Sequence, residues 1–254
     1  MRWLISHGQD SSHRRRSGGG SARGFMTKGL VVSAYALFLG CAQHELTVDF
    51  FRSETYTFSW SEQRAIEFVA RSTLKEVRPL LPALPANIQL TVRPGRDVIE
   101  ETGETASAMA PDAILWTVNP HREGGVAAIT HQWLRASLFH EFHHLVRWSA
   151  AEPHSIIDHA LFEGMATAFE RDFAGVKTPW ADYPPNVREW AAEIRKLPED
   201  ASSRDWLYSH PDGRRWIGMK VGTYWIDQAI AKSGRSSANL STASTRDLLA
   251  LVDQ

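Results

Sequence analysis

The sequence predicts an α+β fold in one compact domain. A helical pattern is followed by two strand-like segments and then by several more helical patterns, which is an order typical of that fold class. The 254 residues are 43% hydrophobic and include ten tryptophans, and this composition excludes a disordered chain. The 28 basic and 29 acidic residues give no reason to expect a nucleic-acid partner, and the single cysteine excludes a disulfide framework.

The first 41 residues differ from the rest in charge and composition. They hold six of the 28 basic residues but one of the 29 acidic residues, which leaves 22 against 28 and a formal charge of −6 in residues 42–254. The stretch Arg14–Gly24 (RRRSGGGSARG) has low complexity and no apolar period, so we expect residues 1–25 to be disordered or to come from an over-extended gene start. Residues 42–60 are expected to be a linker, and residues 61–254 the folded domain.

Residues 26–41 have the order of a secretory signal peptide. A basic start precedes the apolar run Leu30–Leu39, which is too short to span a bilayer, and Gly40 precedes Cys41. This resembles the lipobox of bacterial lipoproteins, although Phe38 stands where that family usually has leucine. The resemblance implies that Met26 is the true start and that an acylated Cys41 anchors the protein in the bacterial cell envelope, facing the periplasm or the exterior. The alternative is a buried strand or helix with an inert core cysteine.

The first half of the expected domain contains one helix and two strands. Apolar residues recur at three- and four-residue steps between Ser61 and Leu81, which predicts an amphipathic helix. Alternation predicts a strand over Asn87–Arg93, and a β-branched and aromatic run predicts another over Ala113–Val118. The stretch between them, Gly95–Ala110, has no clear period and is expected to be a loop, with or without some helix.

The second half is helical. An apolar face predicts a helix over Val126–Trp148, and a second helix is expected from Ser155 to Phe173, where Ser155 and Asp158 have the spacing of a capping box. Further helices are predicted over residues 187–197, 216–231 and 245–252.

One segment of the helix predicted over Val126–Trp148 has the form H-E-x-x-H. His140 and His144 are one helical turn apart on the same face, so both imidazoles can reach one Zn²⁺, and Glu141 lies beside them. This leaves one protein ligand and one water to complete a tetrahedron. The alternative is a helix whose histidines face solvent or pack in the core. His143 is expected to lie at the surface or to orient a ligand.

The third ligand should come from a helix that packs against the H-E-x-x-H helix. Glu163 follows His144 by 19 residues, and the neighbouring Gly164 and Ala166 allow close helix approach. Three other residues compete with Glu163 for this role: His154, Asp158 and His159. Asp158 is better placed to accept a hydrogen bond from a histidine and so to orient it.

Together, HEFHH and EGMA resemble the gluzincin metallopeptidases, and more closely a bacterial family of predicted Zn-dependent proteases with an H-E-x-H-H core and a downstream E-G-x-A. The likeness runs from about Ser61 to the C-terminus and includes Arg214–Asp227. The sequence departs from the pattern at Met219, where a tyrosine often follows the glycine. Tyr224 is an alternative source of that hydroxyl.

This resemblance implies a zincin-like fold with a small, mainly antiparallel sheet, the H-E-x-x-H helix, a packed glutamate-bearing helix and a helical C-terminal part. It also implies one Zn²⁺ per chain on His140, His144 and Glu163, with Glu141 as general base. The expected activity is hydrolysis of a peptide bond in a peptide or protein substrate by a metal-activated water.

Two features of this reaction remain open in the sequence. The developing oxyanion needs a second donor, for which Tyr224, His210 and Tyr208 are candidates. If Ala113–Val118 edges the cleft, an extended peptide could pair with its free backbone groups; the alternative is an ordinary internal strand.

Two other function classes compete with the enzyme. One is a non-catalytic zinc-binding envelope lipoprotein that acts as a chaperone or assembly factor, and the other is an adaptor whose histidines bind no metal. An intact Glu141 favours the enzyme, because a structural zinc site needs no base and usually has four protein ligands. The sequence leaves the oligomeric state open.

Overall fold

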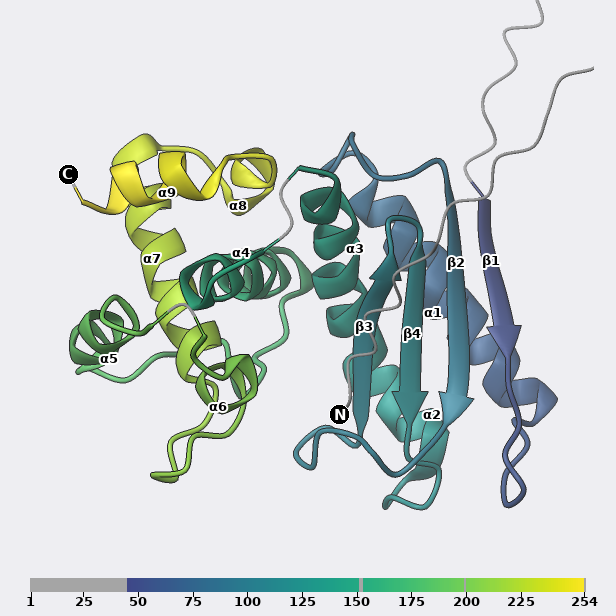
Figure 1. Cartoon of the computed structure of the whole chain (residues 1–254). Helices are drawn as coiled ribbons and strands as arrows, with labels where there is room; N and C mark the ends of the chain where they lie inside the picture. The colour runs from purple at the N-terminus through teal and green to yellow at the C-terminus, as the bar shows by residue number, and fades with distance from the viewer. Residues whose placement is uncertain (1–44, 151–152, 199, 254) are drawn as a thin grey trace, which may run out of the picture. The chain divides into compact units, whose positions relative to one another are not determined.

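The computed structural model describes residues 45–150, 153–198 and 200–253 (Figure 1). The expected disordered start, the signal peptide and Cys41 lie outside the described residues. Contacts divide the chain into Met1–Gln43 and His44–Gln254, and the second unit contains the sheet, the helices and their cores. It has the anatomy of a domain that folds by itself. Among the described helices, each is too short or too polar to cross a membrane.

Four strands form one mixed sheet in the order β1-β2-β4-β3. The strands are β1 (Glu45–Phe50), β2 (Asn87–Pro94), β3 (Glu104–Ala110) and β4 (Ala113–Val118). The β1–β2 and β2–β4 pairs are parallel and the β3–β4 pair is antiparallel. The α+β class is confirmed, but the expectation of a mainly antiparallel sheet is wrong. A helix crosses over between β1 and β2, and such a connection makes strands parallel.

Two strands lie where the sequence predicts none. β1 lies within the expected linker, so the fold begins before residue 61. β3 lies in the expected loop, because its sequence ETASAMA is dominated by small residues and lacks a clear alternation. As a result β4 is an interior strand, and β3 is the edge strand next to it, with β1 at the other edge of the sheet. The hypothesis that a peptide pairs with free backbone groups of Ala113–Val118 is therefore wrong, because β4 is paired on both sides and is an ordinary internal strand.

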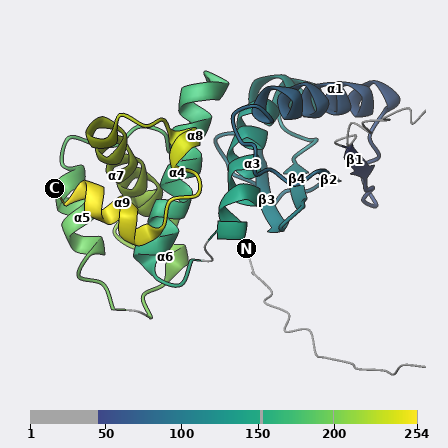
Figure 2. The same cartoon turned by 90° about the horizontal axis from the view of Figure 1, so that it is seen from above.

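Helices pack against the sheet and continue the chain beyond it. Figure 2 shows α1 along one face of the strands. The bounds are α1 (Trp60–Val77), α2 (Gly125–Ile129), a π-helical turn (Thr130–Leu134), α3 (Arg135–Ala150), α4 (Ile156–Ala174), α5 (Val187–Ile194), α6 (Ser203–Leu207), α7 (Ile217–Ser233), α8 (Ser237–Leu240) and α9 (Thr245–Val252). The helix predicted over Val126–Trp148 is thus one run interrupted by a π turn, a feature frequent near functional sites.

The long helices α3 and α4 are held in position by different contacts. α3 packs against the edge strand β3 and against α4. α4 begins at the predicted capping box of Ser155 and Asp158. It then crosses α7 at two glycines: a Cβ on Gly164 would lie 2.1 Å from the carbonyl carbon of Gly222. The glycine next to Glu163 therefore allows a close approach, but to α7 rather than to α3.

Candidate metal centre

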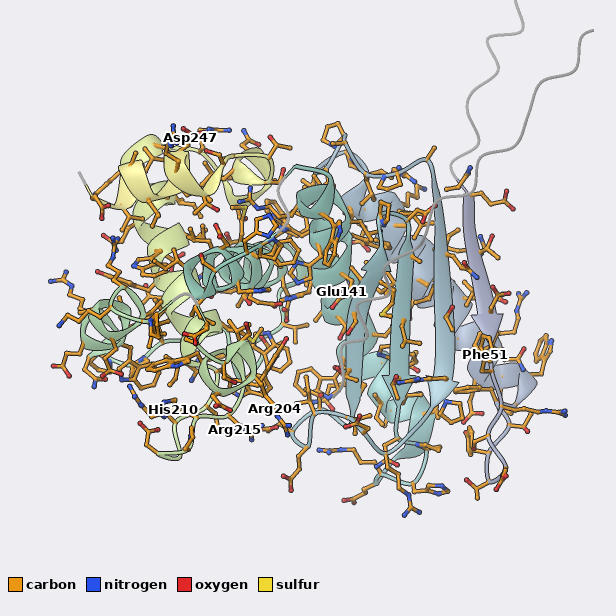
Figure 3. All side chains as sticks on the ribbon, in the orientation of Figure 1. Phe51, Glu141, Arg204, His210, Arg215 and Asp247 are labelled. Atoms are coloured by element: carbon orange, nitrogen blue, oxygen red, sulfur yellow. The ribbon has the colours of Figure 1, made fainter. Side chains whose placement is uncertain are left out.

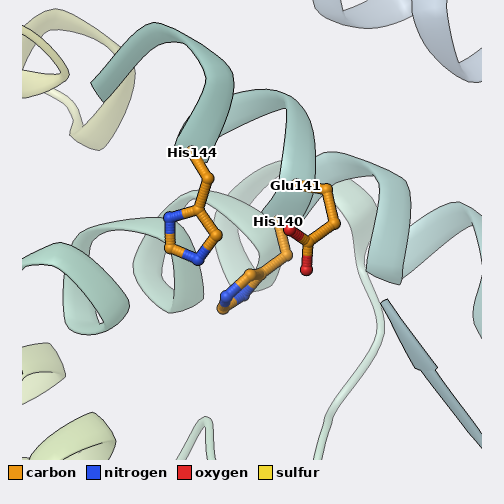
Figure 4. A group of neighbouring side chains, drawn as sticks. All are labelled: His140, Glu141 and His144. Atoms are coloured by element: carbon orange, nitrogen blue, oxygen red, sulfur yellow. The ribbon is translucent and has the colours of Figure 1, made fainter. Parts of the chain in front are cut away.

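α3 presents His140 and His144 on one face, with their ring centroids 4.6 Å apart (Figure 4). His140, Glu141 and His144 are all buried, and each offers a ligand atom within 4.8 Å of the others. The 3.6-residue helical period places positions i and i+4 on the same side. The cluster is compatible with a zinc site.

α4 brings Glu163 to the same point. Its Oε2 lies 3.2 Å from Nε2 of His140 and 3.4 Å from Nε2 of His144. Ligand atoms of a tetrahedral zinc with bonds of about 2.1 Å are separated by about 3.4 Å. The two histidines and Glu163 therefore fit a three-ligand zinc site.

In this cluster opposite charges shift the pKa values of Glu163 and His140 toward the charged forms. Burial would raise the pKa of Glu163, but the two imidazoles hold it well below its usual range. Burial would likewise lower the pKa of His140, but Glu163 and a second carboxylate, Glu170, raise it well above its usual value. A cation at this point would supply positive charge beside the ionised carboxylate of Glu163.

That second carboxylate orients His140 from the side opposite to Glu163. Oε2 of Glu170 lies 3.1 Å from Nδ1 of His140 and accepts a hydrogen bond from Nε1 of Trp180 at 3.3 Å. Carboxylates in this position fix the tautomer of a metal-binding histidine. The expectation that Asp158 has this role is wrong, because the Asp158 carboxylate accepts hydrogen bonds from Ser155 at the start of α4.

The other histidines of the region have different surroundings. The His144 ring stacks on Phe162 with centroids 4.3 Å apart and an interplanar angle of 7°. His143 is fully buried against Phe169 rather than at the surface, and burial lowers its pKa well below the usual value. His154 is exposed, and His159 lies one turn before Glu163.

Glu141 is held by the edge strand. The backbone N–H of Ala108 in β3 donates to Oε2 of Glu141 at 2.6 Å. Burial raises the pKa of Glu141, although His144, His140 and this hydrogen bond oppose the rise. The carboxylate is therefore a stronger base than an exposed glutamate.

The three candidate oxyanion donors lie in different surroundings. Nδ1 of His210 lies 2.8 Å from a carboxylate oxygen of Asp212, and His210 lies on the loop at the lower edge of Figure 3, away from Glu141. The Tyr224 ring contacts Tyr183 edge-on with centroids 5.5 Å apart. Tyr208 is the one whose pKa is raised first by burial and then by the charges of Glu163 and Glu141.

A strained residue holds Tyr208 in place. Trp216 has a φ of 61°, in the left-handed region, and its N–H donates to the carbonyl of Tyr208 at 3.0 Å. Both rings belong to a small apolar cluster with Trp180, Met219 and Ile99. Through this cluster Tyr208 is connected to Trp180, whose indole N–H donates a hydrogen bond to Glu170.

Sequence reasoning missed Glu170, Trp180 and Ala108. Glu170 lies seven residues, about two turns, after Glu163 and so on the same face of α4, which was an available signal. No signal pointed to Ala108 or Trp180, because their roles depend on how β3 and the α4–α5 connection pack.

No curated protein and no solved structure matches this chain. Residues 66–250 match the model of a family described as predicted Zn-dependent protease (DUF2268). That match includes α3, α4 and α7, and with them the whole cluster around Glu163. The chain belongs to this family of predicted Zn-dependent proteases.

Proposed function

We propose that this protein is a zinc metallopeptidase that is anchored by lipid in the bacterial envelope. The observation that supports the activity most directly is the convergence of His140 and His144 on one oxygen of Glu163, with the buried base Glu141 beside them. Three protein ligands leave one position for water, which is the arrangement of catalytic rather than structural zinc sites. Zinc, when bound, lowers the pKa of a water toward ~7 and polarises the scissile carbonyl.

The chain's own residues move the protons. Glu141 takes a proton from the attacking water and later gives it to the leaving amine. The N–H of Ala108 keeps the carboxylate of Glu141 in place between these two transfers. Tyr208 donates its hydroxyl proton in a hydrogen bond to the developing oxyanion, a contribution of roughly two to three orders of magnitude in turnover.

The edge strand β3 is our proposed binding site for an extended peptide. β3 pairs with β4 on one side only, and its free side carries the N–H of Ala108 that holds Glu141. Next to it, Met109 lies at a β-bulge and is 55% exposed. Bulges redirect side chains beside active sites. A peptide paired with β3 would lie beside the base.

Anchoring depends on Cys41. We propose that Cys41 is acylated and becomes the first residue of the mature protein, as its resemblance to a lipobox suggests. Labelling with a fatty-acid probe in bacteria tests this: the wild type should incorporate the label, and Cys41→Ser should not. Incorporation by neither protein would exclude the anchor.

Zinc content tests the metal site. Mass spectrometry of the chain from Ala42 onward should find about one zinc per molecule, and Glu163→Ala should weaken zinc binding sharply. A wild type without zinc would overturn the proposal in favour of a metal-free adaptor.

Hydrolysis tests the enzyme. Glu141→Gln should keep its zinc and lose the cleavage of a fluorogenic peptide library, because the amide cannot take a proton. If the wild type binds zinc but cleaves no peptide or protein substrate, the non-catalytic envelope lipoprotein becomes the better proposal.

A further inference from the structure

The side of α1 that faces away from the sheet has an unusual surface, which we call the α1 outer face. It consists of Trp60, Arg64, Phe68, Arg71 and Lys75. Their spacing of three and four residues places all five along one side of the helix. The opposite side carries the buried residues of α1, which pack into the main core.

Two large aromatic side chains of this face are exposed to solvent. Trp60 is 76% exposed and Phe68 is 75% exposed. They are two turns apart, and the guanidinium of Arg64 between them lies 5.6 Å from the Trp60 ring centroid. Single exposed apolar residues are normal, but two aromatics aligned with cations form a continuous surface of mixed character.

The cations of this face have no counter-ion among the described residues. Arg64, Arg71 and Lys75 form no ion pair with that part of the chain, and together they line a shallow hollow with Glu67, Phe68 and Ser72. Two other acids of α1 are engaged elsewhere. Glu62 closes the capping box with Ser59, and Glu76 pairs with Arg135 at 2.7 Å.

We propose that the α1 outer face binds the surface of an anionic lipid bilayer. Tryptophan and phenylalanine insert at the boundary between headgroups and acyl chains, and lysine and arginine bind the headgroup phosphates. Residues 42–254 carry a formal charge of −6, so an anionic surface repels most of the domain and attracts this face. The charge distribution therefore selects one orientation of the domain on the bilayer.

The point where the chain enters the domain is consistent with this orientation. The N–H of Glu45 and Nη2 of Arg78 both donate to the carbonyl of Ala86, at 3.2 and 2.9 Å. Arg78 caps the C-terminal end of α1. If Cys41 carries the proposed anchor, the four residue steps from Cys41 to Glu45 span at most about 14 Å, so its lipid would hold this end of α1 close to the bilayer.

Vesicle flotation tests the surface without the anchor. The zinc-loaded chain from Ala42 onward, which lacks Cys41, should float with phosphatidylcholine vesicles that contain phosphatidylglycerol, and much less with phosphatidylcholine alone. Binding should fall steeply between 0.1 and 1 M salt, where the Debye length shrinks from about 10 to about 3 Å.

Two variants separate the charged from the apolar contribution. Replacing the three cations of the face by glutamine should weaken binding about fivefold per charge removed. Trp60→Ser with Phe68→Ser should weaken binding at least tenfold. Matched controls should bind as the wild type does: one removes an exposed aromatic elsewhere (Phe51→Ser), and one removes three exposed cations elsewhere (Arg188→Gln, Lys196→Gln and Arg204→Gln).

Three results would overturn the inference. They are no binding to anionic vesicles, equal loss in the variants and in their controls, and a dimer in solution that Phe68→Ser dissociates without any vesicle binding. The last would assign the face to a second copy of the chain. Because this chain lacks Cys41 and the readout is not hydrolysis, failure here is distinguishable from failure of lipid attachment or of catalysis.

Discussion

Oε2 of Glu170 lies 3.1 Å from Nδ1 of His140, while Nε2 of the same ring faces Glu163 at 3.2 Å. The imidazole is thus held between two carboxylates of one helix, α4, which are about two turns apart. Glu163 is placed to share a metal with His140, and Glu170 is placed to decide which nitrogen of the ring carries the proton.

We expect Glu170→Ala to weaken zinc affinity by roughly 10- to 100-fold, because His140 loses the partner that orients it. Glu170→Gln should lose less zinc affinity, since its amide oxygen can still accept a hydrogen bond from Nδ1 of His140. Competition with a chromophoric zinc chelator measures both affinities. Glu189→Gln, an exposed acid on α5, is the control. Wild-type affinity in Glu170→Ala would show that the contact does not tune the site.

Tyr208→Phe should lower kcat by roughly two to three orders of magnitude with zinc content unchanged, because the oxyanion loses a donor. Tyr224→Phe and His210→Gln are matched controls, since their side chains contact Tyr183 and Asp212 respectively. Steady-state kinetics on a cleaved peptide decides between the three residues. A loss in either control and none in Tyr208→Phe would reverse the assignment.

Gly222→Ala should destabilise the protein, although helix propensity alone predicts stabilisation of about 0.5–1 kcal/mol. The new Cβ would lie 1.7 Å from the carbonyl oxygen of Ala160, so α7 must move away from α4 at an overpacking cost of about 1–3 kcal/mol. Calorimetry should show a Tm lower by several degrees. A higher Tm would mean that the two helices do not cross this closely.

Glu104 should make stability depend on pH. Burial raises its pKa from 4.5 to about 7, despite hydrogen bonds from Trp116 and Ser137. Because the folded state holds this proton more tightly than the unfolded state, stability falls as pH rises from about 4.5 to about 7, by at most about 3 kcal/mol.

Denaturation of Glu104→Gln across this range measures that contribution. The amide has no charge to bury, so the variant should lack this part of the pH slope, and its stability relative to the wild type should rise from pH 4.5 to pH 7. A constant difference between the two proteins would mean that Glu104 titrates normally.

Much of the fold was predictable because its elements have local signals. β4 and α9 have the predicted bounds, and α4 begins at the predicted capping box. The same local periodicity places His140, Glu141 and His144 on one side of a helix. These features depend on hydrogen bonds and side-chain spacing within a few residues.

What the sequence by itself determined was therefore the α+β class, the helical H-E-x-x-H segment and a glutamate on a later helix. Only the tertiary structure decided that β3 is the edge strand, that Ala108 holds Glu141 and that Glu170 rather than Asp158 faces His140. The physical reason is the long sequence separation between the residues that make these contacts. Strand order and helix crossing minimise the free energy of the whole core, and contacts such as Gly164 with Gly222 join residues that no local pattern links.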